Sequence, residues 1–283
     1  MTLIGFQALN GLVWGLIIAL IALGLSLVFG LLEVINVAHG ALYMLGAIIG
    51  WYIVNYFGSF WLALAIAPIG VGLLGLLIER GILRPIAGEH VLTIIVTFGL
   101  MLILEHLVLA TFGGAAHRMA APFEWNFKIL GFGYPGYRIF VAGTSVATMA
   151  GLWIFLRKFK YGLWMRAVNQ DREMALGLGI PVRTVFMITF ALGSFLAALG
   201  GILASPIVPI EFRMGLDILV ITFIVVIVGG LGSLEGSVAA AILICELEGI
   251  SSVFVTPTMA RIFSLVFMAC VLLVRPSGLF ARR

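Results

Sequence analysis

Long runs of apolar residues alternate along this chain with short polar connections. Each run is close to the roughly 20 residues that a helix needs to cross the hydrocarbon core of a bilayer. The runs are uniformly apolar, whereas the strands of a membrane barrel alternate polar and apolar residues. Helices are therefore predicted, because a helix satisfies its own backbone groups in lipid. The predicted spans are 8–31, 40–57, 60–79, 91–112, 139–156, 184–204, 216–234, 237–253 and 259–274.

The runs predict an all-α polytopic membrane protein with about eight to nine transmembrane helices. They follow one another without a linker, so residues 1–283 are expected to form one transmembrane domain with no separate soluble part. Polar and glycine-rich interruptions near 33–40 and 229–236 predict broken or re-entrant helices. The interruption at 229–236 either separates two spans or breaks one, and the helix count depends on which. Residues 113–138 are expected to form an ordered surface loop.

Composition leads to the same fold class. The chain is 63% hydrophobic and 10% charged, with a mean hydropathy of +1.24, whereas soluble domains carry about 25% charged residues. Lys and Arg lie in connections between spans rather than on one basic face, which excludes a nucleic-acid-binding protein. His39 has no second ligand at useful spacing, so a metal site is not expected. No G-x-S-x-G or H-E-x-x-H motif occurs, and an enzyme is not expected either.

The basic residues predict the orientation in the membrane. One set of connections holds Arg80, Arg84, Arg157, Lys158, Lys160, Arg166, Arg172, Arg183, Arg275, Arg282 and Arg283. The alternate set holds only Arg118, Lys128, Arg138, Arg213 and Arg261. Connections rich in Lys and Arg remain in the cytoplasm. The N-terminus is therefore expected outside and the C-terminus inside.

One connection, residues 157–183, is charged and punctuated by glycine. A short helix is predicted in its second half, where Asn169 or Asp171 can cap the N-terminus. Glu173 then occupies the first turn, which favours acidic residues. A helix of two turns is too short to be stable alone. The segment therefore either needs a partner surface or lies on the membrane as an amphipathic helix.

Two kinds of residue are expected to end this short helix. Gly177 and Gly179 can adopt the left-handed conformation that closes many helices. Pro181 cannot continue a helix, because it lacks a backbone N–H and its ring clashes with the preceding turn.

Residues 172–206 resemble the cytoplasmic loop and following span of permeases of the high-affinity branched-chain amino acid ABC importer family. In ABC importer permeases this loop is the coupling helix, of the form E-A-A-x3-G. Glu173, Ala175 and Gly177 stand nearest that form, although Met174 replaces an alanine and Gly177 comes two residues early. The family's own version, A-x-x-L-G-I-x-V, fits 178–182 better. The resemblance implies an ATPase-coupling role for Arg166, Asp171, Arg172, Glu173, Ala175, Gly177, Gly179 and Pro181.

Other segments resemble the same family in the same order. They are the I-N-x-A-H-G sequence at 35–40, E-R-x-x-x-R-P at 79–85, G-G-x-G-S-x-x-G at 229–236 and R-P-S-G-L-F at 275–280. Together with the first spans they cover most of the chain. The resemblance implies a permease subunit in the bacterial inner membrane that translocates branched-chain or related small amino acids.

The resemblance also implies partners. They are a paralogous permease, two cytoplasmic ATPase subunits and a periplasmic solute-binding protein. No G-x4-G-K-[ST] motif occurs in this chain, so ATP and magnesium are expected in the ATPase subunits and no cofactor is expected here. Two alternatives remain. The solute can be urea, a short amide or a small organic acid, or the chain can work alone as a secondary transporter or channel.

The two interruptions supply the candidate pathway residues. Irregular backbone at membrane depth is tolerated only inside protein or beside a water-filled cavity. The residues predicted to line the translocation pathway are Asn36, His39, Gly40, Gly229, Gly230 and Gly232. Alternatively, Asn36 and His39 satisfy backbone groups at a helix junction, and the glycines pack helices closely. Glu105, Glu246 and Glu248 also fall within spans, and the sequence assigns them no role.

Overall fold

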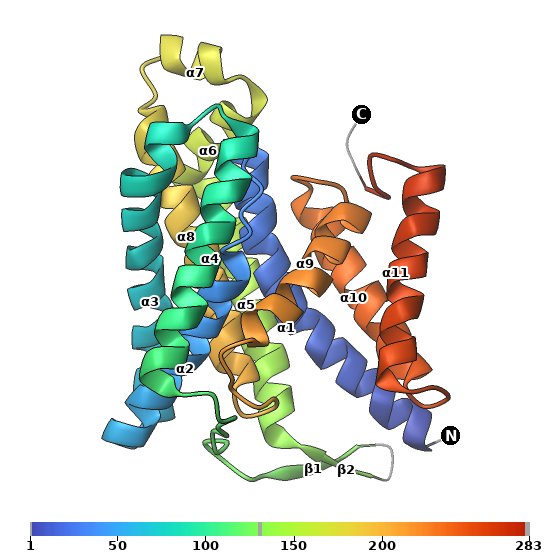
Figure 1. Cartoon of the computed structure of the whole chain (residues 1–283). Helices are drawn as coiled ribbons and strands as arrows, with labels where there is room; N and C mark the ends of the chain where they lie inside the picture. Colours follow the sequence, from blue (N-terminus) through green and yellow to red (C-terminus); the bar gives the residue numbers. More distant parts are fainter. Residues whose placement is uncertain (1, 130–131, 281–283) are drawn as a thin grey trace.

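The computed structural model describes residues 2–129 and 132–280, which form a helical membrane domain with one small β-hairpin (Figure 1). The C-terminal Arg282 and Arg283, used above to predict orientation, lie outside the described residues. The long helices are α1 (Thr2–Leu32), α2 (His39–Phe57), α3 (Phe60–Ile78), α4 (His90–Phe112), α5 (Gly136–Lys158), α8 (Val182–Ala204), α9 (Met214–Gly229), α10 (Leu234–Ser251) and α11 (Pro257–Val274). The shorter elements are η1 (Glu79–Leu83), η2 (Arg84–Ile86), β1 (Asn126–Ile129), β2 (Phe132–Pro135), α6 (Lys160–Gln170) and α7 (Arg172–Gly177).

Every predicted span corresponds to one of the long helices, so the all-α polytopic class is confirmed. Six helices in the described part of the chain, α1 to α5 and α8, are long and apolar enough to cross a membrane. The apolar helices α9 and α11 are shorter. The bundle has two ends: α7 lies beyond the helices at one, and the β1–β2 hairpin lies at the other (Figure 1). We call these the α7 end and the hairpin end.

The core is built around α1 and α8. The middle of α1, residues 17–22, is fully buried, because α1 packs against α8 and α10 while α2 and α3 pack on α8. Small residues allow these close approaches. Gly15 faces the backbone of α10, and Gly46 lies against Ala198 of α8. These glycines therefore pack helices within this chain.

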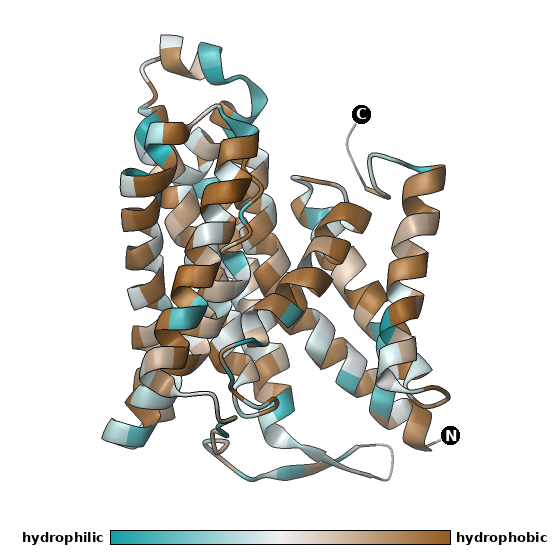
Figure 2. Ribbon diagram, in the orientation of Figure 1, coloured by the Kyte–Doolittle hydropathy of each residue, from teal (hydrophilic) through white to brown (hydrophobic). Residues whose placement is uncertain are grey.

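The outer faces of the bundle are apolar, as lipid requires. Exposed apolar side chains cover α3 and α4, among them Trp61, Leu73, Ile95 and Ile103. The hydropathy-coloured view shows these helices and α11 largely brown, with more hydrophilic residues at α7 (Figure 2). A belt of apolar side chains between two more polar ends is the arrangement that a bilayer stabilises.

The first predicted interruption is a non-helical connection between α1 and α2. Glu33, whose φ is +53°, ends the preceding helix in a left-handed conformation. Thr97 of α4 hydrogen-bonds the backbone of this connection. Its hydroxyl lies 3.3 Å from the carbonyl oxygen of Ile35 and accepts the N–H of Val37 at 3.3 Å. Polar backbone at this depth is thus satisfied by protein.

The second interruption separates two helices, which resolves the alternative left open by the sequence. Helix α9 ends at Gly229, the chain turns through 230–233, and α10 begins at Leu234. The Ser233 hydroxyl caps α10 by accepting the N–H of Gly236 at 3.2 Å. The C-terminal segment closes the other side of the turn, since Leu279 N–H donates to the Val228 carbonyl oxygen at 2.8 Å.

The hairpin end carries the predicted surface loop. Within it, β1 and β2 pair antiparallel with Phe127 opposite Tyr134. Strands of four residues give too little alternation for the sequence to predict them. The loop is also tied to the α8–α9 connection, because His117 and Ile210 exchange backbone hydrogen bonds of 2.9 and 2.8 Å. The described part of this loop is therefore ordered, as predicted.

Candidate functional site

The candidate coupling segment consists of two helices, α6 and α7, where the sequence predicted one. Gly162, Met165 and Val168 are the buried residues of α6. Their spacing of three, with polar residues between them, is the amphipathic signal that could have predicted this helix. Gly162 lies against the backbone of α5 at residues 155–156, which holds the start of α6 close to the preceding span.

Helix α7 has a defined N-terminus. The Asp171 carboxylate Oδ1 accepts the backbone N–H of Met174 at 2.8 Å, which makes Asp171 the capping residue and confirms one of the two predicted candidates. Glu173 follows in the first turn and is exposed. An N-cap of this type stabilises a helix by about 0.5–2 kcal/mol, which matters for a helix of six residues.

The C-terminus of α7 ends in a left-handed glycine. Gly179 has a φ of +76°. Its N–H donates to the Leu176 carbonyl oxygen at 3.0 Å, and the next N–H, of Ile180, donates to the Ala175 carbonyl oxygen at 3.0 Å. These two bonds form a Schellman motif. The expectation of a left-handed Gly177 is wrong, because this residue still belongs to the helix and Leu178 separates it from the turn.

Pro181 connects this turn to the next span. Its carbonyl oxygen accepts the N–H groups of Thr184 and Val185 at 2.9 and 3.1 Å, and α8 begins at the following residue, Val182. Four residues of defined conformation, 178–181, thus join α7 to α8.

One residue of α7 faces inward and several apolar ones face outward. Ala175 is 2% exposed, whereas Met174, Leu176 and Leu178 are 62%, 54% and 73% exposed. Arg172 and Glu173, which precede them, are also exposed. Helix α7 stands beyond the bundle (Figure 1). Exposed apolar side chains beside charged ones on a protruding helix are typical of a surface that binds another protein.

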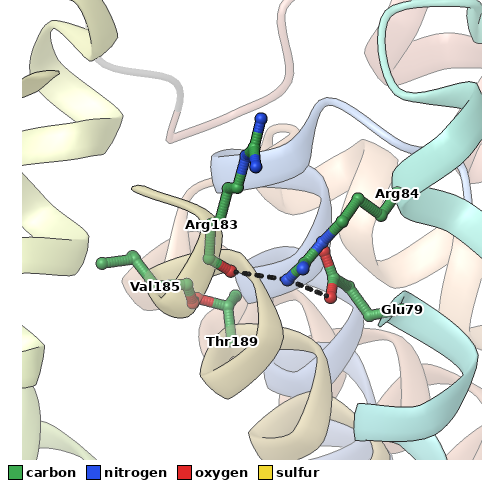
Figure 3. Close-up of polar contacts among 5 residues, drawn as sticks. All are labelled: Glu79, Arg84, Arg183, Val185 and Thr189. Atoms are coloured by element: carbon green, nitrogen blue, oxygen red, sulfur yellow. Dashed lines mark hydrogen bonds and ion pairs between the residues drawn. The ribbon is translucent and has the colours of Figure 1, made fainter. Parts of the chain in front are cut away.

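An ion pair fixes the neighbouring connection to the start of α8. Arg84 lies 3.3 Å from the Glu79 carboxylate and donates to the Arg183 carbonyl oxygen at 3.4 Å (Figure 3). Glu79 is 2% exposed, and this is the single ion pair in the part of the chain that the structure describes. Arg84 thus joins the α3–α4 connection to the residues that follow α7.

Two cavities adjoin the coupling segment. The larger, of about 560 Å³, is lined by Glu79, Arg84, Pro85, Ala87, Arg172, Leu176, Val182, Arg183 and Phe186. Within it the Arg172 guanidinium lies 5.2 Å from the centre of the Phe186 ring. Such a cation–π contact contributes about 0.5–1 kcal/mol at exposed sites and orients α7 on α8.

The smaller cavity, of about 90 Å³, connects the coupling segment to the second interruption. Arg166 and Asn169 of α6 line it together with Gly30 of α1 and Gly232 of the α9–α10 turn. The structure thus brings together Arg166, predicted to couple, and Gly232, predicted to line the pathway. The sequence did not predict this proximity, because the two residues lie far apart in the chain and were assigned to different sites.

Asn36 and His39 are both 1% exposed. The His39 ring donates from Nε2 to the Ile21 carbonyl oxygen of α1 at 2.9 Å. Its Nδ1 and both amide atoms of Asn36 have no hydrogen-bond partner among the described residues. His39 therefore satisfies a backbone group at the helix junction, and each of the two side chains keeps an unused polar atom. Their role in the pathway stays a prediction.

The remaining predicted pathway residues contact other backbone segments. Gly40 lies against Gly215 of α9, and Gly229 lies against Gly236 of α10. Gly230, with a φ of +102°, begins the turn between the two helices. These close contacts are explained by helix packing. Of the six pathway candidates, Gly232 is the one that lines a cavity described above.

Comparison with known proteins adds the family. A sequence model described as "Branched-chain amino acid transport system / permease component" matches residues 7–272. The chain is 28% identical to the high-affinity branched-chain amino acid transport system permease protein LivH of Salmonella typhimurium, over 98% of this chain and 95% of that protein. It is 27% identical to the corresponding protein BraD of Pseudomonas aeruginosa, with the same coverage.

A more distant relative comes from an archaeon. The chain is 25% identical to the probable branched-chain amino acid transport permease protein LivH of Methanocaldococcus jannaschii, over 95% of this chain and 90% of that protein. No solved structure matches the chain.

Proposed function

This chain belongs to the family of branched-chain amino acid transport permease components, which makes it a permease subunit of an ABC importer, and we propose that it carries branched-chain or related small amino acids across the bacterial inner membrane. Energy comes from ATP and magnesium bound by separate ATPase subunits. A paralogous permease completes the pathway, and a periplasmic binding protein delivers the solute. The names of relatives aligned over nearly the whole chain support the amino acid solute.

The observation that carries the coupling role is the build of α7. This helix is capped at both ends, anchored by the buried Ala175, and presents exposed Met174 and Leu178. So short a helix is not stable on its own. A defined conformation with an apolar outer face supports docking against an ATPase subunit.

Three connections would transmit the movement of that subunit. Pro181 links α7 to α8, and Arg84 links the start of α8 to the α3–α4 connection. Arg166 adjoins α1 and the α9–α10 turn through the small cavity. Because packed helices move as rigid bodies, a push on α7 would shift the spans between outward-open and inward-open arrangements.

The orientation follows from the same site. Arg80, Arg84, Arg157, Lys160 and Arg172 belong to connections at the α7 end, which therefore faces the cytoplasm by the positive-inside rule. The hairpin end then faces the periplasm, with α1 beginning there, so the N-terminus is outside and the C-terminus inside.

The test is reconstitution of the whole importer in proteoliposomes. With the paralogous permease, both ATPases and the binding protein present, ATP should drive uptake of radiolabelled leucine. Glu173→Lys and Gly177→Trp should reduce uptake at least tenfold while ATP hydrolysis persists. A Cβ at Gly177 meets nothing within 4 Å, so the tryptophan alters the docking surface and leaves the fold intact.

Two matched control variants test whether a change of surface charge or an added bulky side chain reduces uptake by itself. Glu89→Lys changes an exposed carboxylate of another connection, and Gly143→Trp adds the same bulk at an open position in α5. Both should retain uptake. Normal uptake in the α7 variants would contradict the docking role, and solute flux through this chain without ATPase subunits would favour a stand-alone transporter. Uptake of urea, an amide or an organic acid in place of leucine would show that the proposed solute class is wrong.

A further inference from the structure

A third cavity, of about 350 Å³, opens at the hairpin end. It lies where the starts of α1, α5 and α11 meet the end of α10 and the residues after α8. Its lining includes Asn10, Trp14, Arg138, Glu248, Ala260 and Arg261. This volume is within the range of about 300–1,000 Å³ that small-molecule sites occupy.

The cavity contains charges of both signs from three different helices. Arg138 comes from α5, Arg261 from α11 and Glu248 from α10. None of them forms an ion pair within the described residues, where the sole pair joins Arg84 to Glu79 at the opposite end. Because these charges do not pair directly with one another, a ligand that carries both signs could pair with each.

The cationic side of the cavity is held in place. Arg138 donates to the Asn10 amide oxygen, and Tyr134 donates to the same oxygen at 3.3 Å. Burial raises the pKa of Tyr134 although Arg138 opposes the shift, so this phenol stays a neutral donor. Arg138 is thereby fixed in orientation, and Arg261 adds an exposed guanidinium across the cavity. Guanidinium groups match the geometry of a carboxylate.

The anionic side has an unfilled hydrogen-bonding position. Glu248 is half-buried, and its Oε1 is buried without a hydrogen-bond partner among the described residues. Arg261 is close enough to interact with it electrostatically, and the Ser264 hydroxyl of α11 is close enough to interact with the same carboxyl group. A buried acceptor without a donor is unfavourable, and more so when it is charged. An ammonium group, which has three donors and no acceptor, would supply the donor for Oε1 together with a positive charge.

Between the charges the wall is apolar. Trp14, Ile207, Val208 and Ala260 contribute side chains without charge. Burying an aliphatic side chain against such a wall is favourable, because it removes apolar surface from water. The cavity thus combines a carboxylate-binding group, an ammonium-binding group and an apolar surface.

We propose that this cavity is an outer binding site for the zwitterionic head of an apolar amino acid. Arg261 and Arg138 bind the α-carboxylate, Glu248 binds the α-ammonium, and the side chain of the solute packs on Trp14. The inference rests on the proposed function and deepens it, because a solute that lacks either charge is discriminated against in this chain. Urea, amides and organic acids lack at least one of the two.

Binding is tested on the full chain in lipid nanodiscs by saturation-transfer NMR, with empty nanodiscs as the blank. The probes are L-leucine, 3-methylbutylamine, 4-methylpentanoate and 4-methylpentanamide, which share the branched chain and differ in the charged groups. Leucine should bind at least tenfold more tightly than the other three. Glu248→Gln and Arg261→Gln should each weaken leucine binding at least tenfold, and Arg261→Lys should restore part of it, because the cation is kept.

Each variant should also weaken binding of only one of the two singly charged probes. Glu248→Gln should abolish residual amine binding and spare the carboxylate, and Arg261→Gln should do the reverse. Glu124→Gln and Arg118→Gln change exposed charges outside the cavity and should leave leucine binding unchanged. Equal binding of all four probes, or wild-type leucine affinity in Glu248→Gln and Arg261→Gln, would overturn the inference. So would occupation of the cavity by lipid alone, seen as no leucine signal.

ATP-driven uptake separates this inference from the proposed function. If the reconstituted importer takes up leucine and the cavity variants do so at wild-type rate and KM, the amino acid importer stands and the outer site is wrong. If no amino acid is taken up by the wild-type importer, the proposed solute itself is wrong.

Discussion

Gly40, near the start of α2, and Gly215, near the start of α9, lie backbone against backbone. A Cβ added at Gly215 would come 2.7 Å from the carbonyl oxygen of Gly40, and one added at Gly40 would meet the Gly215 carbonyl oxygen in turn. The two helices therefore cross without a side chain between them. Helix α2 follows the first interruption, and α9 precedes the second. This contact therefore holds the two helices against each other.

Gly40→Ala should destabilise the fold by about 1–3 kcal/mol, the usual cost of overpacking, because the clash is with backbone and no rotamer relieves it. The measurement is reversible unfolding in mixtures of mild detergent and SDS. Gly70→Ala is the matched control, since a Cβ there meets nothing within 4 Å, and it should change stability by less than about 0.5 kcal/mol. Equal stability of the two variants would contradict the close crossing.

The C-terminal segment should stabilise the α9–α10 turn through Gly278. This glycine has a φ of +91°, and an added Cβ would lie 2.6 Å from the α-carbon of Gly230. Gly278→Ala therefore combines left-handed strain of about 1–2 kcal/mol with a backbone clash.

Gly88→Ala isolates the strain from the clash. Its φ is +101°, and it has open space around the Cβ position. Thermal unfolding should show a larger loss for Gly278→Ala than for Gly88→Ala. A similar loss in both would mean that the C-terminal segment does not press on the turn.

Arg84 should matter to stability more than its neighbour Arg80. Arg84→Met leaves the Glu79 carboxylate buried without its cation and removes the bond to the Arg183 carbonyl oxygen. Breaking a fully buried pair costs about 3–5 kcal/mol. Since the Arg84 side chain is 31% exposed, we expect about 2 kcal/mol.

The control for this pair is Arg80→Met, which removes an exposed arginine from the same connection. Adding Glu79→Gln to Arg84→Met should recover part of the loss, because the buried charge disappears with its partner. A double variant that is less stable than Arg84→Met would show that the pair is not the source of the effect.

The orientation can be tested by cysteine labelling in whole cells. After Cys245→Ser and Cys270→Ser, Leu178→Cys should react with a membrane-impermeant maleimide only in opened cells, because α7 is placed in the cytoplasm. Lys128→Cys in the hairpin should react in intact cells. The opposite pattern would invert the topology and place the outer binding cavity inside.

Local chemistry made several features predictable. Asp171 before Glu173 indicated a helix start, and the glycine and proline that follow indicated its end, because capping depends on residues a few positions apart. The same reasoning erred at Gly177, since two nearby glycines fit the left-handed position and only the hydrogen bonds select Gly179. Helix α6 was not predicted, because only three buried residues, Gly162, Met165 and Val168, mark its inner face.

The apolar runs alone determined that this is a helical membrane protein with interruptions at 33–40 and 229–236, because lipid leaves the backbone no other way to satisfy its polar groups. The approach of Arg166 to Gly232, the backbone contact of Gly40 with Gly215, and the meeting of Arg138, Glu248 and Arg261 in one cavity were decided by the tertiary structure. Spans of uniform hydrophobicity have no marked face, so their sequence does not specify their neighbours. Small residues and packing select them once the chain has folded.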